Sequence, residues 1–352
     1  MSSKKSMPMM SPIDELTEMP IDEPIDEPIE SPEEEPMASA EVSLAPHGPH
    51  DDGQEHHHHT HAANSAHPGH HHLLTVEHLS VSFSMYDSQA PFFKAAKRDV
   101  RVIDDLSVSV HAGELVAVVG ASGSGKTLLA DAVMGLYEPN ATVRGTIWFD
   151  GEQQDAQSLA ALRGNGISYV PQSAGCLDPM MRVADQVAGF GQGAGKDKRA
   201  ARKAKALELL QRYGLGQDAA RMYPHQLSGG MARRVLMCSA LMDDPKLIIA
   251  DEPTPGLDDH LAQQDMGDLR AFANGGGGVL LITHDIELAL RYADRIAVFK
   301  DATVVEETSV ASFASPSTLR HPFSRALWHA LPQHDFVAPQ DSGEECAHAQ
   351  AR

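Results

Sequence analysis

The alternation of apolar and polar side chains changes character near residue 73. Residues 73–83 and 102–110 alternate between apolar and polar positions, which predicts two β-strands that each bury one face. Further runs are predominantly apolar and have strand length, a pattern typical of strands buried on both faces of a parallel sheet. These runs are residues 115–119, 167–170, 247–250 and 279–282.

Apolar residues at helical spacing predict two helices in addition to these strands. Residues 128–134 predict a helix directly after a glycine-rich loop, and residues 197–213 predict an amphipathic helix whose other face carries Lys and Arg. A basic face is also found on helices that bind nucleic acid. Because the whole chain has a formal net charge of −21, a solvated helix face is the better interpretation, and we expect no nucleic-acid partner.

Residues 1–72 show no such periodicity. They contain fifteen acidic residues against Lys4 and Lys5, and their apolar residues are few and isolated. Residues 21–32 repeat a degenerate four-residue pattern that begins with Ile and ends with Pro, which excludes a helix. So little apolar surface cannot offset the entropy lost on ordering. We therefore expect a disordered acidic and His-rich tail over residues 1–72, which serves as a solubilising spacer or as a docking motif.

Eleven of the twenty histidines lie between residues 47 and 72. Neutral imidazole binds nickel, zinc and copper, and neighbouring histidines on a flexible segment can reach one ion together. Two alternatives stay open: a polar linker that is rich in histidine by chance, and an expression tag, although the runs are short and interrupted. The candidate Ni²⁺ or Zn²⁺ ligands are His56, His57, His58, His59, His61, His70, His71 and His72.

The cysteines and the apolar runs indicate the cellular compartment in which the chain works and whether the chain itself crosses a membrane. Cys176, Cys238 and Cys346 are far apart and odd in number, which suggests neither a disulfide framework nor a zinc site and fits a reducing compartment. The apolar runs are too short to cross a bilayer, and the N-terminus lacks an apolar signal segment. We therefore expect any membrane role to belong to a partner chain.

A glycine-rich motif, Gly120-x4-Gly125-Lys126-Thr127, follows one apolar run and precedes a predicted helix. This strand–loop–helix context is typical of phosphate-binding loops, in which backbone N–H groups at a helix N-terminus cradle the anion. Lys126 is expected to bind the β- and γ-phosphates of ATP, and the Thr127 hydroxyl is expected to bind Mg²⁺. The candidate nucleotide-binding residues of this loop are Gly120, Ser122, Gly123, Ser124, Gly125, Lys126 and Thr127.

Polar residues also follow the other buried runs. Asp251 and Glu252 come at the end of one of them; Asp251 is expected to orient Mg²⁺, and Glu252 to polarise the attacking water. His284 is expected to contact the γ-phosphate and to keep Glu252 in register with that water. Gln172 is expected to reach Mg²⁺ and water, and thereby to sense the nucleotide.

The segment Ser228-Gly229-Gly230 precedes another predicted helix, where the Ser228 side chain caps the helix and the glycines let an anion approach. Alone, this segment could be only a helix cap. In order with the other motifs, residues 227–231 resemble the signature sequence of ATP-binding-cassette proteins. Residues 73–312 then resemble the nucleotide-binding domain of that family. The resemblance implies an α/β P-loop NTPase with a mostly parallel sheet core, an antiparallel β subdomain and a helical subdomain at about 173–226.

The resemblance also implies how the nucleotide is held. In that family two cassettes dimerise head to tail, so the Ser228 tip of one would bind the γ-phosphate held by Lys126 of the other. Asp258 matches the loop that links the two sites. An aromatic residue upstream of the phosphate loop stacks on adenine in that family. Here the candidates are Tyr86, Phe92 and Phe93, of which Phe93 is preferred.

Residues 176–179, 223–231 and 321–327 are similar to segments of oligopeptide, dipeptide and nickel importer ATPases. This similarity implies a peripheral subunit at the cytoplasmic face of the membrane, with a C-terminal appendage at 313–352, that powers uptake of peptides or of nickel and metal chelates. The expected partners are a second, paralogous cassette chain, two membrane permease subunits and an extracytoplasmic substrate-binding protein. The alternative is a soluble cassette ATPase with a metal-storage or DNA-associated role.

Overall fold

The computed structural model describes residues 42–43, 72–86, 97–189, 196–255, 257 and 259–331. All of these residues belong to one compact unit, Ser39–Arg352. The acidic repeat and the histidines before His72 lie outside the described residues, so for them the disordered tail stays a prediction. Val42–Ser43, also within the predicted tail, instead form a short strand that pairs with residues 143–144.

The larger sheet is mostly parallel, as the continuous apolar runs predicted. Its strand order is β11-β10-β4-β9-β8-β7, and each neighbouring pair is parallel except β10 with β11. The strands are β4 (Leu115–Val119), β7 (Ile167–Val170), β8 (Leu247–Asp251), β9 (Gly278–Thr283), β10 (Arg295–Lys300) and β11 (Thr303–Ser309).

Alternate residues of β4 show how this sheet is covered on both faces. Leu115, Ala117 and Val119 pack in one apolar cluster with residues of α6 (Gly229–Leu241), α7 (Asp259–Asn274) and α8 (Ile286–Tyr292). Val116 and Val118 pack in a second cluster with α1 (Lys126–Val133) and with the antiparallel sheet. Because both faces of the strand are buried, its sequence is apolar at every position.

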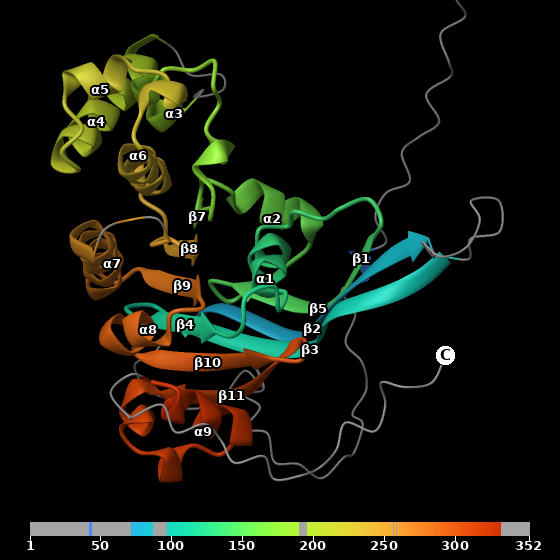
Figure 1. Ribbon diagram of the computed structural model, residues 1–352. Helices are drawn as coiled ribbons and strands as arrows, with labels where there is room; N and C mark the ends of the chain where they lie inside the picture. Colours follow the sequence, from blue (N-terminus) through green and yellow to red (C-terminus); the bar gives the residue numbers. More distant parts are fainter. Residues whose placement is uncertain are drawn as a thin grey trace, which may run out of the picture. The chain divides into compact units, whose positions relative to one another are not determined.

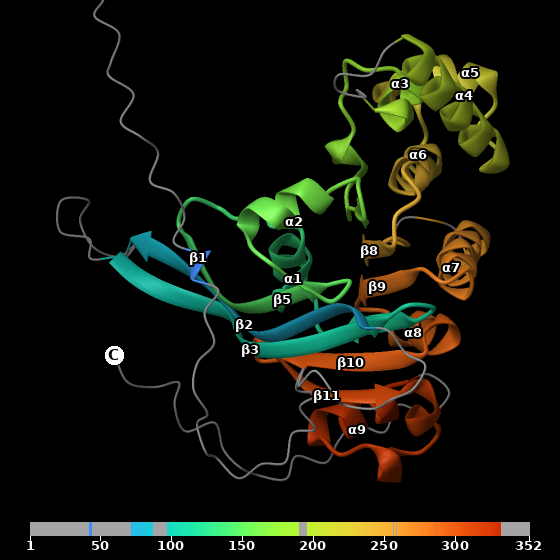
Figure 2. The same ribbon diagram turned by 180° about the vertical axis from the view of Figure 1, so that it is seen from behind.

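The antiparallel sheet forms the second layer on the α1 side, and Figures 1 and 2 show its long strands side by side. β2 pairs with both β3 and β5 in antiparallel register, and two short strands add to β5. The strands are β1 (Val42–Ser43), β2 (His72–Tyr86), β3 (Lys97–His111), β5 (Ala141–Phe149) and β6 (Glu152–Gln154). β2 and β3 extend beyond the predicted ranges 73–83 and 102–110, because their outer, exposed ends still pair, as between Tyr86 and Lys97.

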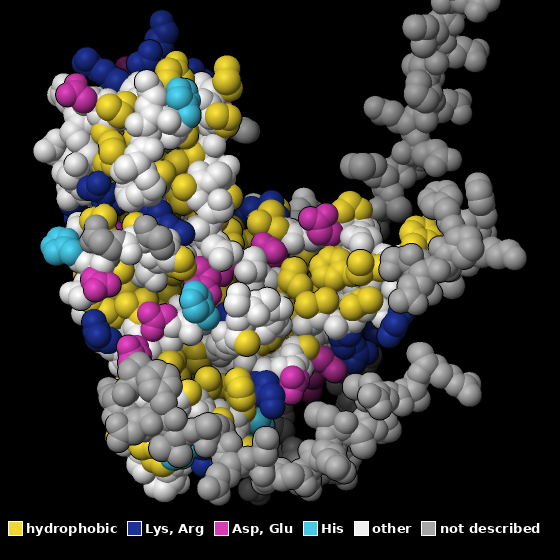
Figure 3. Space-filling view, viewed as in Figure 1, with side chains coloured by type: hydrophobic (Ala, Val, Ile, Leu, Met, Phe, Trp, Pro, Cys, Tyr) yellow, Lys and Arg dark blue, Asp and Glu magenta, His cyan; other side chains and the backbone are white. Residues whose placement is uncertain are grey.

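Three helices described between β7 and β8 correspond to the predicted helical subdomain. They are α3 (Val183–Ala188), α4 (Lys196–Arg212) and α5 (Gln217–Arg221), and they pack on one another and on α6. α2 (Ala156–Leu162) precedes β7. The basic helix predicted over 197–213 is α4, and Figure 3 shows Lys and Arg side chains gathered at this end of the molecule. Several of them form ion pairs with aspartates, as Arg202 does with Asp243, in keeping with a solvated face.

The chain after β11 continues through η4 (Val310–Ala314) and η5 (Pro316–Thr318) into α9 (Pro322–His329). The Glu306 carboxylate accepts from the backbone N–H groups of Arg320 (2.8 Å) and His321 (2.9 Å), and Trp328 Nε1 donates to the carbonyl of Phe313 (2.8 Å). The two bonds to Glu306 fasten the first part of the predicted appendage to β11, and the Trp328–Phe313 bond holds α9 to η4.

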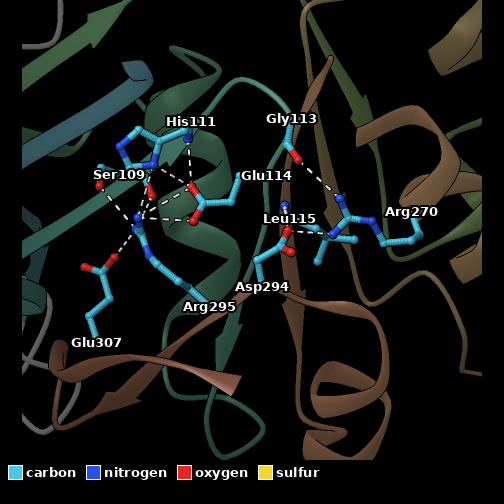
Figure 4. Close-up of polar contacts among 9 residues, drawn as sticks. All are labelled: Ser109, His111, Gly113, Glu114, Leu115, Arg270, Asp294, Arg295 and Glu307. Carbon is cyan, nitrogen blue, oxygen red and sulfur yellow. Dashed lines mark hydrogen bonds and ion pairs between the residues drawn. The ribbon is translucent and has the colours of Figure 1, made fainter. Parts of the chain in front are cut away.

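Asp294, just before β10, connects three elements at the start of β4 (Figure 4). Its Oδ2 accepts from the backbone N–H of Leu115 (2.8 Å) and from Arg270 Nη1 (2.5 Å), and Arg270 Nη2 also donates to the carbonyl of Gly113 (3.2 Å). The start of β4 is therefore fixed to both β10 and α7, and β4 leads directly into the glycine-rich loop.

The next residue, Arg295, joins the two sheets (Figure 4). Its Nη2 donates to the carbonyl of Ser109 in β3 (2.7 Å) and pairs with Glu307 of β11. Its Nη1 lies 3.3 Å from Glu114, which also accepts from His111. Burial raises the pKa of Glu114, but the hydrogen bond from His111 and the charge of Arg295 outweigh it and lower that pKa below its ordinary value.

Candidate functional site

The glycine-rich loop joins β4 to α1, and its backbone requires glycine. A Cβ on Gly120 would lie 2.5 Å from the carbonyl oxygen of Phe299 in β10, so only glycine fits between the loop and that strand. Gly123 has a φ of +75°, in the left-handed region that favours glycine. Lys126 opens α1, and its Nζ donates to the carbonyl oxygens of Gly120 (2.9 Å) and Ala121 (2.7 Å). The lysine therefore folds over the loop.

The buried polar atoms of this site fit a nucleotide with its magnesium ion. Ser124 Oγ and Asp251 Oδ1 are buried and have no hydrogen-bond partner among the residues that the structure describes. Asp251 is fully buried at the end of β8, where it accepts hydrogen bonds from Thr127 and Tyr169. Buried polar atoms are normally paired. A phosphate oxygen is an acceptor for the serine hydroxyl, and a divalent cation is a partner for the carboxylate.

The electrostatics of the site favour the same pair of ligands. Burial raises the pKa of the Asp251 carboxyl above its ordinary value, while the hydrogen bond from Thr127 opposes that shift. Burial lowers the pKa of the Lys126 ammonium, which the charges of Glu252 and Asp251 oppose. Both shifts mean that the protein alone disfavours the charged forms. A bound phosphate stabilises the charged lysine, and a bound Mg²⁺ stabilises the charged aspartate.

The structure brings Glu252 and His284 together, as their places after neighbouring strands predicted. His284 Nδ1 lies 2.8 Å from both carboxylate oxygens of Glu252. Glu252 is buried, whereas the His284 side chain is 54% exposed. Glu252 has a φ of +46°, unusual for a residue with a side chain, and its N–H donates to the carbonyl of Ile282 (2.8 Å). A carboxylate so held can accept a proton from a water that comes within hydrogen-bonding distance.

Arg233 belongs to this site, although the sequence analysis did not identify it. Gln172 is exposed just after β7, and its carbonyl accepts from Arg233 Nη2 (2.8 Å). Arg233 Nη1 donates to the carbonyls of Glu252 (3.0 Å) and Pro253 (3.1 Å). The sequence offered no signal for these contacts, since every acceptor is a backbone carbonyl.

The predicted helix cap at Ser228 is confirmed. Ser228 is the N-cap of α6, and its Oγ accepts from the backbone N–H of Met231 (3.3 Å). Ser228 and Gly229 are exposed, while a Cβ on Gly230 would lie 3.1 Å from Leu261. The N-terminus of α6 thus presents backbone donors at the surface, where an anion from another molecule can approach.

Some predicted site residues fall outside the described part of the chain. Phe93, Asp258 and the candidate Ni²⁺ or Zn²⁺ ligands other than His72 are among them. His72 is the first residue of β2 and not the last residue of the tail; its ring lies 4.3 Å from that of His111, centroid to centroid. Within the described ranges, no group of three or more His, Cys, Asp or Glu side chains is arranged to hold a metal ion.

A cavity of about 390 Å³ lies between α1 and the antiparallel sheet. Phe83 of β2 and Leu128 of α1 line it, together with Tyr137 and the carboxylates of Asp131 and Glu138. Figure 3 shows hydrophobic side chains gathered over this region of α1 and β5. Phe83 is a further candidate for stacking on the base. The sequence analysis treated it only as a strand residue.

Comparisons with known proteins agree with this geometry. Residues 103–255 match the ABC transporter family. The oligopeptide transport ATP-binding protein OppD of Lactococcus lactis subsp. cremoris is 35% identical over 255 residues, covering 70% of this chain and 75% of that protein. The dipeptide transport ATP-binding protein DppD of Escherichia coli is 36% identical over 272 residues, covering 74% and 79%.

A solved dimeric, post-hydrolysis structure of an ATP-binding cassette bound to ADP and Pi superimposes with a TM-score of 0.57. It is 27% identical and covers 67% of this chain and 98% of that one. Of the helices that the structure describes, none is long and apolar enough to cross a membrane. The chain therefore belongs to the ABC transporter family, and it is an ATP-hydrolysing importer cassette of the oligopeptide and dipeptide type.

Proposed function

We propose that this chain powers the uptake of peptides, and that its ATP site is completed by a second cassette. The observation that carries this proposal is the exposed Ser228 tip of α6. The phosphate loop of the same chain supplies donors on one side of a triphosphate. The exposed tip supplies a second set of backbone donors to a triphosphate held elsewhere.

Each residue of the site has a distinct task in this proposal. Lys126 and the backbone of the loop bind the β- and γ-phosphates, and the Ser124 hydroxyl, which has no partner among the described residues, adds a donor. Glu252 accepts a proton from the attacking water, and His284 orients the Glu252 carboxylate through their 2.8 Å contact. Thr127, Asp251 and Gln172 would hold Mg²⁺, which supplies positive charge that neutralises the triphosphate.

The base of the nucleotide is proposed to stack on Phe83. This residue lines the cavity beside α1, and α1 begins with Lys126. One nucleotide could therefore place its base in the cavity and its phosphates at the loop. Tyr86, at the end of β2, is 65% exposed and does not line that cavity. Phe93, preferred from the sequence, stays a candidate outside the described residues.

The cargo and the partners follow from the relatives. Because the relatives are named as oligopeptide and dipeptide transport proteins, peptides are the favoured cargo. Nickel or metal chelates, bound first by residues His56–His59 and their neighbours, form the second candidate, which rests on composition alone. The proposed partners are a second, paralogous cassette, two permease subunits and an extracytoplasmic substrate-binding protein, with this chain on the cytoplasmic face of the membrane.

Transport by the reconstituted complex tests the proposal. Proteoliposomes with the co-purifying membrane chains should take up labelled peptide when ATP is supplied on the side of this chain, and Lys126→Ala should abolish uptake. Uptake of ⁶³Ni²⁺ without peptide uptake would instead support the metal cargo. ATP turnover that no membrane chain or cargo changes would contradict an importer role.

A further inference from the structure

Arg233 links the helix that carries the Ser228 tip to two segments of the catalytic site. It lies in the second turn of α6. Its Nη2 donates to the carbonyl of Gln172, 61 residues away, and its Nη1 donates to the carbonyl of Glu252, 19 residues away. A third bond reaches the carbonyl of Pro253 (3.1 Å). One planar guanidinium therefore joins α6, the loop after β7 and the loop after β8.

The contact with Glu252 supports an unusual backbone conformation. At a φ of +46°, Glu252 occupies a region that residues with side chains rarely adopt and that persists only where the surroundings hold it. The N–H of Glu252 donates to Ile282 of β9, and its carbonyl accepts from Arg233. These two contacts fix the peptide groups on either side of the Cα atom, and so the direction in which the carboxylate meets His284.

Other arginines of this region serve a different purpose. Arg234 donates to the carbonyls of Tyr213 (2.9 Å) and Gly230 (3.3 Å), neither of which lies in the loop after β7 or β8. Arg202 of α4 donates to the carbonyl of Ala188 (2.6 Å) and pairs with Asp243. Those side chains fasten helices to one another. Arg233 differs because all three of its acceptors lie in the loops that carry the sensor glutamine and the catalytic glutamate.

We propose that Arg233 is a positioning residue that couples contact at the Ser228 tip to the geometry of Glu252 and Gln172. The proposal rests on the proposed function, in which a nucleotide held by the facing cassette binds that tip. When the tip is engaged, α6 is held in place, and the rigid guanidinium holds both loops with it. The three printed bonds of Arg233 all go to backbone carbonyls, so it acts through the positions of Glu252 and Gln172. A lysine carries all its N–H donors on one nitrogen and lacks the planar fork that places two donor nitrogens toward different loops.

The test compares Arg233→Ala and Arg233→Lys with the control Arg202→Ala, each in the full-length chain within its importer complex. ATP turnover should fall between about tenfold and a hundredfold in Arg233→Ala, as expected when a catalytic group is displaced by about 1 Å. Arg233→Lys should recover little of this loss, and KM for ATP should change by less than about threefold, because ground-state binding is untouched. Arg202→Ala should keep turnover within about twofold of the wild type.

A second measurement separates coupling from a loss of folding. In a Glu252→Gln background, ATP-dependent dimerisation of the Arg233→Ala chain should match that of the parent, and its melting temperature should drop no more than that of Arg202→Ala. Wild-type turnover in Arg233→Ala, full recovery by lysine, or loss of dimerisation together with turnover would each overturn the inference. If Lys126→Ala leaves the ATP turnover of the wild-type complex unchanged, the proposed function itself fails, and that outcome is distinct from the preceding ones.

Discussion

Asp265 of α7 makes the protein less stable at neutral pH than a neutral residue of the same shape would. It is 3% exposed, and its Oδ1 is buried with no hydrogen-bond partner among the residues that the structure describes. Burial raises the pKa of this carboxyl from 3.8 to about 6, and the charge of Asp268 adds to the shift, while Arg234 and Arg233 oppose it. The folded protein therefore holds the Asp265 proton more tightly than the unfolded chain does, and at neutral pH the ionised carboxylate is buried at a cost in stability.

The size and sign of the effect follow from this shift. Between pH 3.8 and about 6 the folded protein keeps the Asp265 proton while the unfolded chain loses it. The free energy of unfolding therefore falls as pH rises through this window and stays low above it. A shift of about two pKa units, at about 1.36 kcal/mol per unit, corresponds to about 3 kcal/mol.

Asp265→Asn removes the ionisation and should raise the free energy of unfolding at pH 7.5 by up to about 3 kcal/mol. The gain over the wild type should shrink as pH falls below about 6 and should vanish near pH 4. Urea unfolding followed by circular dichroism from pH 4 to 8 measures both curves, with Asp218→Asn on the exposed face of α5 as the control for loss of a surface carboxylate. A gain that is equal at every pH, or a loss at pH 7.5, would show that ionisation of the buried Asp265 does not lower the free energy of unfolding.

Three further outcomes are expected from the contacts described above. Phe83→Ala should raise KM for ATP by about fivefold or more with kcat little changed, whereas Tyr86→Ala should not; equal effects would remove Phe83 from the base site. Arg295→Met should lower the free energy of unfolding by about 3–5 kcal/mol at pH 7.5, because Glu114 and Glu307 both lose their charged partner. The loss should be smaller at pH 4, where both carboxylates can be protonated. A loss in urea titrations that does not depend on pH would contradict this. Ala302→Gly, at a φ of +71°, should raise the melting temperature by relieving about 1 kcal/mol of strain, and a lower melting temperature would show that the turn is not strained.

The strands of the core were predictable because burial on both faces leaves a continuous apolar run, as in residues 115–119 and 247–250. The outer ends of β2 and β3 were not, since the polar residues there pair through backbone groups that any side chain allows. For the same reason Arg233 escaped prediction, as its three acceptors are backbone carbonyls. The contact of Glu252 with His284 was predictable, because parallel neighbouring strands bring their carboxyl ends together.

The α6 cap was predictable from a local pattern, because Ser228 reaches an N–H group only three residues ahead. The importance of Phe83 was not, because the cavity that it lines is formed by α1 and by strands distant in sequence. Local patterns, and the residues that follow the buried parallel strands, were therefore available from the sequence. Contacts that depend on how the helical part and the two sheets pack required the structure.

In the proposed complex, each ATP is held between two cassettes. The most direct measurement is the structure of the Glu252→Gln complex with ATP and Mg²⁺, since loss of the general base should slow hydrolysis by about 10²- to 10⁴-fold and so preserve the triphosphate. We expect the γ-phosphate to lie within hydrogen-bonding distance of Lys126 in one cassette. The same γ-phosphate should contact the Ser228–Gly230 tip of the facing cassette, or the counterpart of that tip in a paralogue. A triphosphate contacted by a single cassette, with the α6 tip facing solvent, would contradict it.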